Sequence, residues 1–126
     1  MFISIIIPTL NEEQRIGLCL DRLLQQVKKQ DSRIEIIVVD GGSTDRTAQE
    51  VLVRGICLLH SKPGRGQQQH RGAEAARGKT LLFLHSDTNL PDTFSYDIPS
   101  TLGKRETVAG AFRLRINSKG LGFRLI

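Results

Sequence analysis

Short apolar runs alternate along this chain with segments whose apolar residues recur at helical spacing. The runs have the length of buried strands and span residues 2–7, 34–39, 56–59 and 81–84. Strands that alternate with helices favour an α/β fold, in which right-handed crossovers join the strands of a largely parallel sheet. The sequence therefore predicts a central sheet that lies between helices.

Helix signals fill the gaps between these runs. Apolar positions at helical spacing over 16–27 predict a first helix, for which Asn11 is a candidate cap. A second helix is expected after Ser43 or Thr44, which are candidate caps, and a third helix is expected over 67–77.

The last part of the chain predicts two further elements. Pro91 opens a short helix toward Leu102. Residues 108–116 alternate apolar residues with Arg113 and Arg115, a pattern that is typical of a half-exposed strand. These elements continue the alternation of strand and helix.

The composition is that of an ordinary globular domain, because 39% of the 126 residues are hydrophobic and 25% are charged. This length predicts one domain, residues 1–126, that can bury a core without disulfides. No apolar run approaches the about 18 residues of a membrane span, and the apolar start lacks the basic flank of a signal peptide. Cys19 and Cys57 fall in a helical and a strand pattern, so we expect them to be buried and reduced, which indicates the cytoplasm.

The net charge of +5 is unevenly distributed along the chain. Residues 1–59 hold seven basic and eight acidic residues, whereas residues 60–126 hold eleven basic and five acidic residues, a net of +6. A basic half favours an anionic partner such as a phosphate, a nucleic acid or a lipid headgroup, and it is also typical of a solvated surface.

Three loops follow strands at the edge where a parallel sheet binds its ligands. In such sheets, ligands bind at the carboxyl ends of the strands. This rule selects the segments 8–12, 40–45 and 85–88. The rule for parallel sheets alone therefore predicts that these three loops form the binding site.

Two aspartates follow buried runs, Asp40 directly and Asp87 after His85 and Ser86. Asp40 precedes two glycines, so its carboxylate is placed to accept from a ribose hydroxyl or a base N–H; a turn or helix cap is the alternative. Asp87 suits a hard divalent cation, which often takes one or two protein carboxylates together with phosphate oxygens. His85 would be a second metal ligand or a phosphate donor, and the alternative is a turn aspartate beside a surface histidine.

Glycine-rich segments elsewhere carry weaker signals. The stretch 62–66 is a basic loop before a helix start, where backbone N–H groups and Arg65 would face a diphosphate. The segment 72–80 looks like a P-loop, but it has one residue too many between its glycines and runs from helix to strand. We therefore exclude a P-loop, and the sequence also lacks a classical dinucleotide fingerprint and zinc-ligand spacing.

Taken together, these loops resemble the family-2 glycosyltransferases, which have the GT-A fold. The resemblance rests on five blocks in the family's order and approximate spacing: Ser4–Glu12, Val38–Asp45, Gly64–Gly66, Ala73–Gly78 and Phe83–Asp87. Residues 109–113 further resemble the strand that follows the metal motif in a small bacterial subgroup. The family implies a three-layer, Rossmann-like GT-A half that binds a nucleotide-sugar and has a largely parallel central sheet.

The resemblance implies sugar transfer from a nucleotide-sugar, most often a UDP-sugar, to an acceptor that the sequence does not identify. It implies Mn²⁺ or Mg²⁺ as cofactor, with Asp87 as metal ligand and His85 as a second candidate. The cation would neutralise charge on the leaving nucleoside diphosphate. Family members invert the anomeric centre and use a carboxylate base to deprotonate the acceptor. The residues implied in nucleotide binding are Pro8, Thr9, Asn11, Glu12, Asp40, Gly42, Arg65, Ser86 and Asp87.

The sequence departs from the family in two ways. The metal motif of the family is Asp-x-Asp, whereas this chain has His-Ser-Asp at 85–87. The acidic base segment of the family lies well beyond the strand expected at 108–116, and no acid of this chain matches it. We therefore expect a donor-binding half that lacks the catalytic base and transfers no sugar alone. Uncovered surfaces would favour a homo-oligomer, and the apolar stretch 120–126 would begin a helix of the acceptor half, with contact at the inner face of a membrane as the alternative.

Two other functions compete with this interpretation. A noncatalytic nucleotide-binding or regulatory module would keep Asp40 and Asp87 and would also lack a base. A nucleic-acid binder is disfavoured, because most aromatic residues after residue 59 fit core positions rather than a stacking platform.

Overall fold

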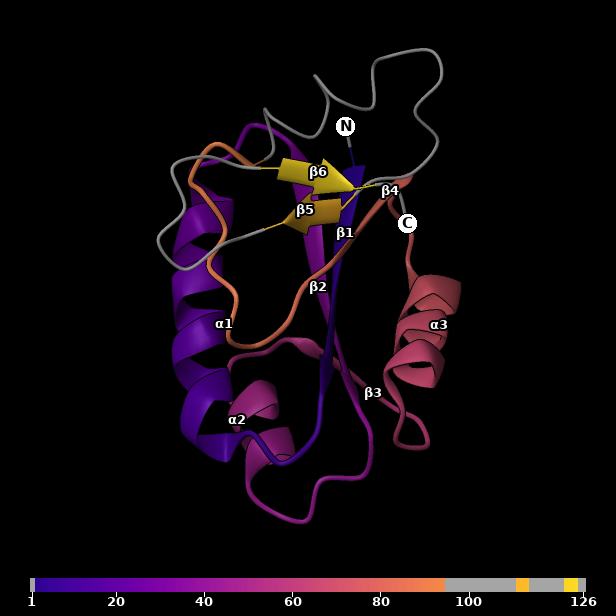
Figure 1. Ribbon diagram of the computed structural model, residues 1–126. Helices are drawn as coiled ribbons and strands as arrows, with labels where there is room; N and C mark the ends of the chain where they lie inside the picture. The colour runs from indigo at the N-terminus through magenta and orange to yellow at the C-terminus, as the bar shows by residue number, and fades with distance from the viewer. Residues whose placement is uncertain (1, 95–110, 114–121, 125–126) are drawn as a thin grey trace.

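The computed structural model describes residues 2–94, 111–113 and 122–124. Its centre is a four-stranded parallel sheet with the order β3-β2-β1-β4 (Figure 1). The strands are β1 (Phe2–Thr9), β2 (Arg33–Asp40), β3 (Cys57–His60) and β4 (Thr80–Phe83). Because β1 lies between β2 and β4, the loop at its carboxyl end adjoins those of both neighbours.

Helices cover both faces of this sheet (Figure 1). α1 (Glu13–Lys28) and α2 (Thr47–Leu52) lie on one face, and α3 (Arg65–Ala75) lies on the other. A separate antiparallel pair consists of β5 (Ala111–Arg113) and β6 (Gly122–Arg124). The predicted α/β architecture, with a largely parallel sheet between helices, is confirmed.

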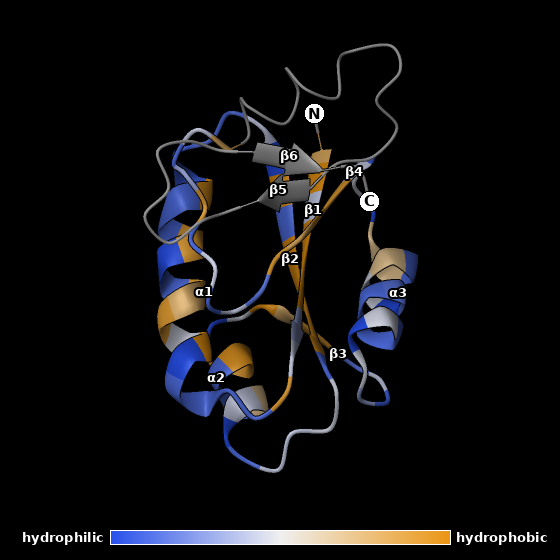
Figure 2. Ribbon diagram, viewed as in Figure 1, coloured by the Kyte–Doolittle hydropathy of each residue, from blue (hydrophilic) through white to orange (hydrophobic). Residues whose placement is uncertain are grey.

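Each face of the sheet has its own apolar core, because successive side chains of a strand point to opposite faces. On the α1 side, the isoleucines at 3, 5 and 7 of β1 pack against the apolar stripe of α1. On the α3 side, Ile6, Ile37 and Val39 form a smaller cluster with the partly buried Ala73. Figure 2 shows the corresponding pattern on α1, whose polar residues face away from the sheet.

β1 continues through Pro8 to Thr9, although the apolar run that predicted this strand spans only residues 2–7. The pairing with β2 extends to Thr9 opposite Asp40, whereas the pairing with β4 ends at Ile6 opposite Phe83. Pro8 has no N–H to donate, so it is tolerated where one of the two neighbouring strands has already ended. The longer strand brings Thr9 directly beside Asp40.

Other predicted elements have shifted or incomplete bounds. α3 begins at Arg65, two residues earlier than expected. The segment 72–80 runs from helix to strand, whereas a P-loop runs from strand to helix, so the exclusion of a P-loop is confirmed. The expected helix toward Leu102 lies almost wholly outside the described residues, and only Ala111–Arg113 of the strand expected over 108–116 is described. Within the described ranges, no helix is both long enough and apolar enough to cross a membrane.

The two cysteines differ in their environments. Cys57 is exposed, contrary to the prediction, because β3 forms an edge of the described sheet. Cys19 on α1 is partly buried, and burial, reinforced by the charge of Glu12, raises the pKa of its thiol to about 11. The Cys19 thiol therefore stays protonated at neutral pH.

A polar cluster joins β1, β2 and the turn before β4, away from the predicted site. Ser4 Oγ donates to Glu35 Oε2 at 2.5 Å and accepts from the Gly78 N–H at 2.8 Å, while the Arg77 N–H donates to Glu35 Oε2 at 2.6 Å. Burial alone would raise the pKa of Glu35, but the hydrogen bonds from Ser4 and Arg77 outweigh it and lower the pKa. Glu35 therefore stabilises the fold as a carboxylate.

We predict that Glu35→Gln removes part of the pH dependence of stability. Because the pKa of Glu35 is lowered in the folded chain, its contribution is present above the pKa of an unfolded glutamate and is lost as the pH falls through the folded value. Urea titrations should give a free energy of unfolding about 1 kcal/mol lower for the variant at neutral pH, and the difference should shrink below about pH 4. Glu74→Gln, on the exposed side of α3, is the control, and an equal loss there would contradict this role.

We predict that Gly72→Ala destabilises the fold by about 1–3 kcal/mol, as overpacking does. A Cβ on Gly72 would lie 2.5 Å from Ile6 Cγ2 and 3.1 Å from Val39 Cγ2. A Cβ on Gly66, in the same helix, would meet nothing within 4 Å, so Gly66→Ala should be neutral or should gain up to about 1 kcal/mol. Thermal and urea unfolding measure both effects, and similar losses in the two variants would refute the packing argument.

Candidate functional site

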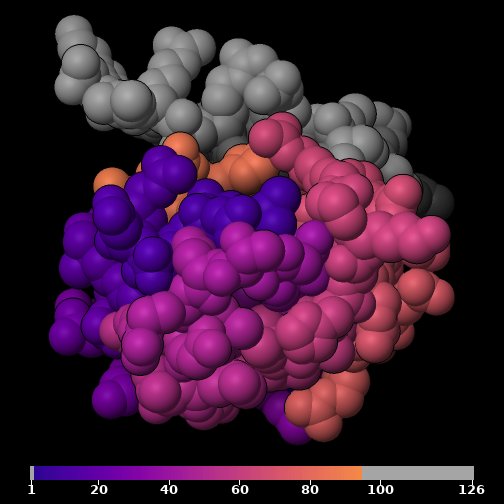
Figure 3. Space-filling view, turned by 90° about the horizontal axis from the view of Figure 1, so that it is seen from below, coloured from indigo at the N-terminus to yellow at the C-terminus, as the bar shows by residue number. Residues whose placement is uncertain are grey.

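The loops after β1 and β2 are locked together at the carboxyl edge of the sheet. Asn11 is the link, because its N–H donates to Ser43 Oγ at 2.8 Å and its Oδ1 accepts from the Thr44 N–H at 2.8 Å. Asn11 has a φ of 50°, a left-handed conformation that asparagine tolerates better than most residues. The two loops adjoin when the molecule is seen from below (Figure 3). Asn11 is therefore not the predicted helix cap, since α1 begins at Glu13 and the cap position belongs to Glu12.

Thr47, the first residue of α2, and Asp45 just before it accept hydrogen bonds from the backbone where α1 begins. The Glu12 N–H donates to Thr47 Oγ1 at 2.8 Å, and the Glu13 N–H donates to Asp45 Oδ2 at 3.3 Å. Desolvation alone would raise the pKa of Asp45, but hydrogen bonds from Thr47 and from the Glu13 backbone outweigh it and lower the pKa. The expected caps of α2 bond to Asn11 instead, and α2 begins later, at Thr47.

Asp40 is buried at the end of β2, and its carboxylate shapes the loop that follows. Its Oδ2 accepts from the N–H groups of Gly42 and Ser43 at 3.2 and 2.9 Å, and the Ser43 hydroxyl donates to its Oδ1. Gly42 has a φ of 102°, which residues with a side chain rarely adopt. His60, which the sequence pattern did not single out, pairs with Asp40 across the sheet and has its Nδ1 3.9 Å from Asp40 Oδ2. Asp40 thus forms a turn and lies beside an exposed imidazole.

Thr9 and Glu12 meet where β1 passes into α1. Thr9 is buried, and its hydroxyl donates to Glu12 Oε2 at 2.8 Å. Arg15 Nη2 lies 3.5 Å from the other carboxylate oxygen, Glu12 Oε1. Pro8 is buried next to Thr9. The Glu12 carboxylate is therefore held between a strand end and the first turn of a helix.

The segment after β4 carries His85, Ser86 and Asp87, and of these Ser86 and Asp87 face α1. His85 is half-buried, Ser86 is 6% exposed and Asp87 is exposed. Among the described residues, Ser86 Oγ is the one buried side-chain N or O atom without a hydrogen-bond partner. Ser86, Asp87 and Cys19 line a cavity of about 260 Å³ between α1 and residues 84–90.

A hard cation suits the donor set of this segment. An exposed carboxylate beside an unpaired buried hydroxyl offers the oxygen ligands that Mg²⁺ and Mn²⁺ prefer. In the described part of the chain, no three His, Cys, Asp or Glu side chains are grouped as a complete metal site. A cation held here would therefore need ligand atoms from a bound molecule or from water.

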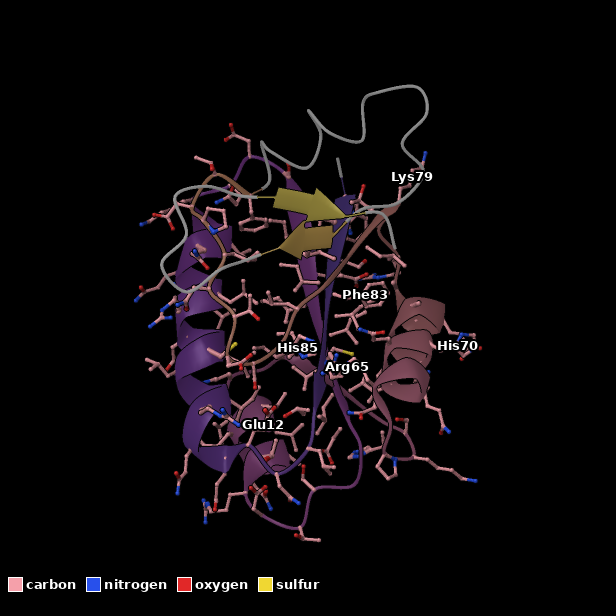
Figure 4. The ribbon with its side chains drawn as sticks, in the orientation of Figure 1. Glu12, Arg65, His70, Lys79, Phe83 and His85 are labelled. Carbon is pink, nitrogen blue, oxygen red and sulfur yellow. The ribbon has the colours of Figure 1, made fainter. Side chains whose placement is uncertain are left out.

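The loop before α3 reaches the same half of the molecule. Gly64 has a φ of 139°, and α3 begins directly after it at the exposed Arg65. In Figure 4, Glu12, His85 and Arg65 lie in the half of the view toward which β1 and β2 run, whereas Lys79 lies at the opposite end. The structure thus places predicted residues from four loops toward the carboxyl ends of the strands.

A buried glutamine that the sequence pattern did not reveal connects these loops. Gln68 of α3 is 4% exposed, and its side chain bonds to the backbone of Thr9, Val39 and Gly64. A glutamine within a run of three glutamines is typical of a solvent-facing helix surface. One feature of the sequence could have indicated burial. Gln68 lies one helical turn before Gly72, which faces the sheet, so the two residues share a face of α3.

The chain matches the family described as "Glycosyl transferase family 2" over residues 4–125. The dolichyl-phosphate beta-glucosyltransferase of Mus musculus is 31% identical to it over 107 residues, which cover 71% of this chain and 33% of the relative. The dodecaprenyl-phosphate galacturonate synthase of Rhizobium johnstonii is 31% identical over 113 residues, which cover 82% of this chain and 32% of the relative. This chain therefore spans about a third of the length of these relatives.

A solved glycosyltransferase shares the fold. The glucosyl-3-phosphoglycerate synthase from Mycobacterium tuberculosis, in complex with Mn²⁺ and uridine-diphosphate-glucose, aligns with a TM-score of 0.66 at 28% identity, over 83% of this chain and 40% of that one. The Rossmann-like GT-A fold is thereby confirmed, as is the resemblance carried by the loops. This chain belongs to glycosyl transferase family 2.

Proposed function

We propose that this chain binds the nucleotide-sugar donor of a glycosyltransferase. The observation that carries the proposal is the edge where the interlocked loops after β1 and β2 lie next to the segment after β4. A donor joins a base, a ribose and a diphosphate, and a ligand of that length suits an edge built from several strand ends. The mycobacterial neighbour, which was solved with Mn²⁺ and uridine-diphosphate-glucose, supports a UDP-sugar as the donor class.

The proposed nucleotide contacts come from the end of β2, the start of α3 and the segment after β4. Asp40 would hold the ribose or base, since its carboxylate lies at the end of a central strand beside glycines. Arg65 would lie near the diphosphate, because it is an exposed cation at the start of α3. The residues that we assign to nucleotide contact are Pro8, Thr9, Asn11, Glu12, Asp40, Gly42, Arg65, Ser86 and Asp87.

Mg²⁺ or Mn²⁺ is the proposed cofactor, with Asp87 as its ligand and His85 as a second candidate. Support comes from the exposed Asp87 carboxylate, because such cations often bind one or two carboxylates together with substrate phosphates. When bound, the cation would neutralise charge on the leaving nucleoside diphosphate. The buried Ser86 hydroxyl would gain its missing partner from the same ligand.

We further propose that residues 1–126 form one donor-binding domain and that sugar transfer requires more than these residues. An inverting transfer uses a carboxylate base to deprotonate the acceptor hydroxyl. Asp40 and Asp45 are engaged by their own loops, and Asp87 is assigned to the cation. The relatives' greater length leaves room for a base and an acceptor site in the part of those proteins that this chain does not match.

We predict that UDP binds in the presence of Mn²⁺ and that Asp87→Ala weakens binding by at least about tenfold, the equivalent of about 1.4 kcal/mol. The matched control is Asp31→Ala, an exposed aspartate before β2 and therefore at the opposite end of the sheet. Calorimetric titration with UDP and GDP, in Mn²⁺ and in EDTA, measures both variants. A Kd that is the same in Mn²⁺ and in EDTA, and the same in wild type and Asp87→Ala, would contradict the cation site. Failure of both nucleotides to bind would contradict the donor site.

A further inference from the structure

The side chain of Gln68 is a three-way connection between loops that are distant in sequence. Its Nε2 donates to the carbonyl oxygens of Thr9 and Val39, each at 2.9 Å, and its Oε1 accepts from the Gly64 N–H at 3.2 Å. The side chain reaches these groups from within α3, where the residue is 4% exposed. One buried amide thus joins the ends of β1 and β2 to the start of its own helix.

This connection requires an amide of this length. A primary amide offers two N–H donors and a carbonyl acceptor, and all three functions of Gln68 are used here. The two carbonyl partners and the one N–H partner also determine which end of the amide is nitrogen, because a reversed amide would set oxygen against oxygen. Lysine and arginine have no acceptor, and a carboxylate has no donor.

Each of the three backbone groups bonded by Gln68 belongs to a residue of the proposed donor site or to the residue just before one. The Thr9 carbonyl also accepts from the Gly41 N–H at 2.9 Å, Val39 precedes Asp40, and Gly64 precedes Arg65. Gly41 packs against the amide so closely that a Cβ there would lie 3.0 Å from Gln68 Cδ and Oε1. The amide, the glycine and the strand ends therefore fit together as one joint.

We propose that Gln68 is a positioning residue for the donor site, which rests on the proposed function. It sets the relative positions of Thr9, the Asp40 loop and the Gly64–Arg65 turn, and touches no substrate itself. Loss of the amide lets these three segments move apart while the apolar packing of α3 through Gly72 remains. Nucleotide affinity then falls by more than the loss of stability accounts for.

The test compares Gln68→Met with two matched variants in calorimetric titrations of UDP with Mn²⁺, at a temperature where circular dichroism shows each variant folded. Gln68→Met keeps the approximate volume and removes the three hydrogen bonds, so its Kd should rise by at least about tenfold, as expected when binding groups are misplaced. Gln67→Met makes the same change on the exposed side of α3 and should leave Kd within about twofold. Gly72→Ala destabilises the packing of α3 without removing the amide and should also keep its Kd.

A purely structural role of Gln68 predicts a different result, in which affinity follows stability across all three variants. That result, or a normal Kd in Gln68→Met, would overturn the proposal. A second measurement needs no nucleotide: in amide NMR spectra of the free protein, Gln68→Met should shift Gly41, Ser43 and Gly64 and leave Ser4 and Leu82 in place. Unshifted loop amides would also overturn the proposal. If wild type binds neither UDP nor GDP, the donor site itself is refuted, and the amide spectra alone decide whether Gln68 holds the loops.

Discussion

The pairing of β1 with β2 continues one residue past Pro8, and the rest of the site depends on this register. Thr9 thereby lies opposite Asp40, and the Thr9 carbonyl accepts from the Gly41 N–H at 2.9 Å. A slip of one residue would turn Asp40 to the other face of the sheet, because side chains alternate along a strand. The buried apolar side chains of β2 oppose such a slip, since it would turn each of them to the opposite face of the sheet. The apolar core thus holds the polar site in register.

Polar groups on the β1–β2 side of the site satisfy one another. Asn11 forms hydrogen bonds with the loop after β2. Where α1 begins, Thr47 and Asp45 accept hydrogen bonds from two successive backbone N–H groups. Exchange of partners between two loops fixes each loop by the other, so neither needs a ligand to define its shape. A surface that is already ordered loses less conformational freedom when it binds. This side is therefore preorganised for whatever it binds.

The sequence was sufficient for the features that follow from local periodicity. The strands, the layers and the edge where the loops meet all come from apolar runs and the rule for parallel sheets. Partners across loops could not be predicted in this way. Asn11 reads as a helix cap until the structure shows Ser43 beside it, and Gln68 reads as a surface residue until its carbonyl partners are known. The prediction that Cys57 is buried was wrong, because the apolar pattern of an edge strand does not differ from that of a central strand.

The two sides of the site therefore differ in how they are built. On the β1–β2 side, hydrogen bonds within the protein complete the arrangement, whereas on the β4 side the buried Ser86 hydroxyl has no partner among the described residues. Such an atom costs about 1–3 kcal/mol while it is unpaired, and native proteins seldom keep one without a reason. A ligand that supplies the partner removes this cost only in the bound state, so the unpaired hydroxyl favours binding over the free form. The nucleoside end of a donor would then bind a surface on the β1–β2 side that is already formed. Its diphosphate end would supply the hydrogen-bond partner that the β4 side lacks.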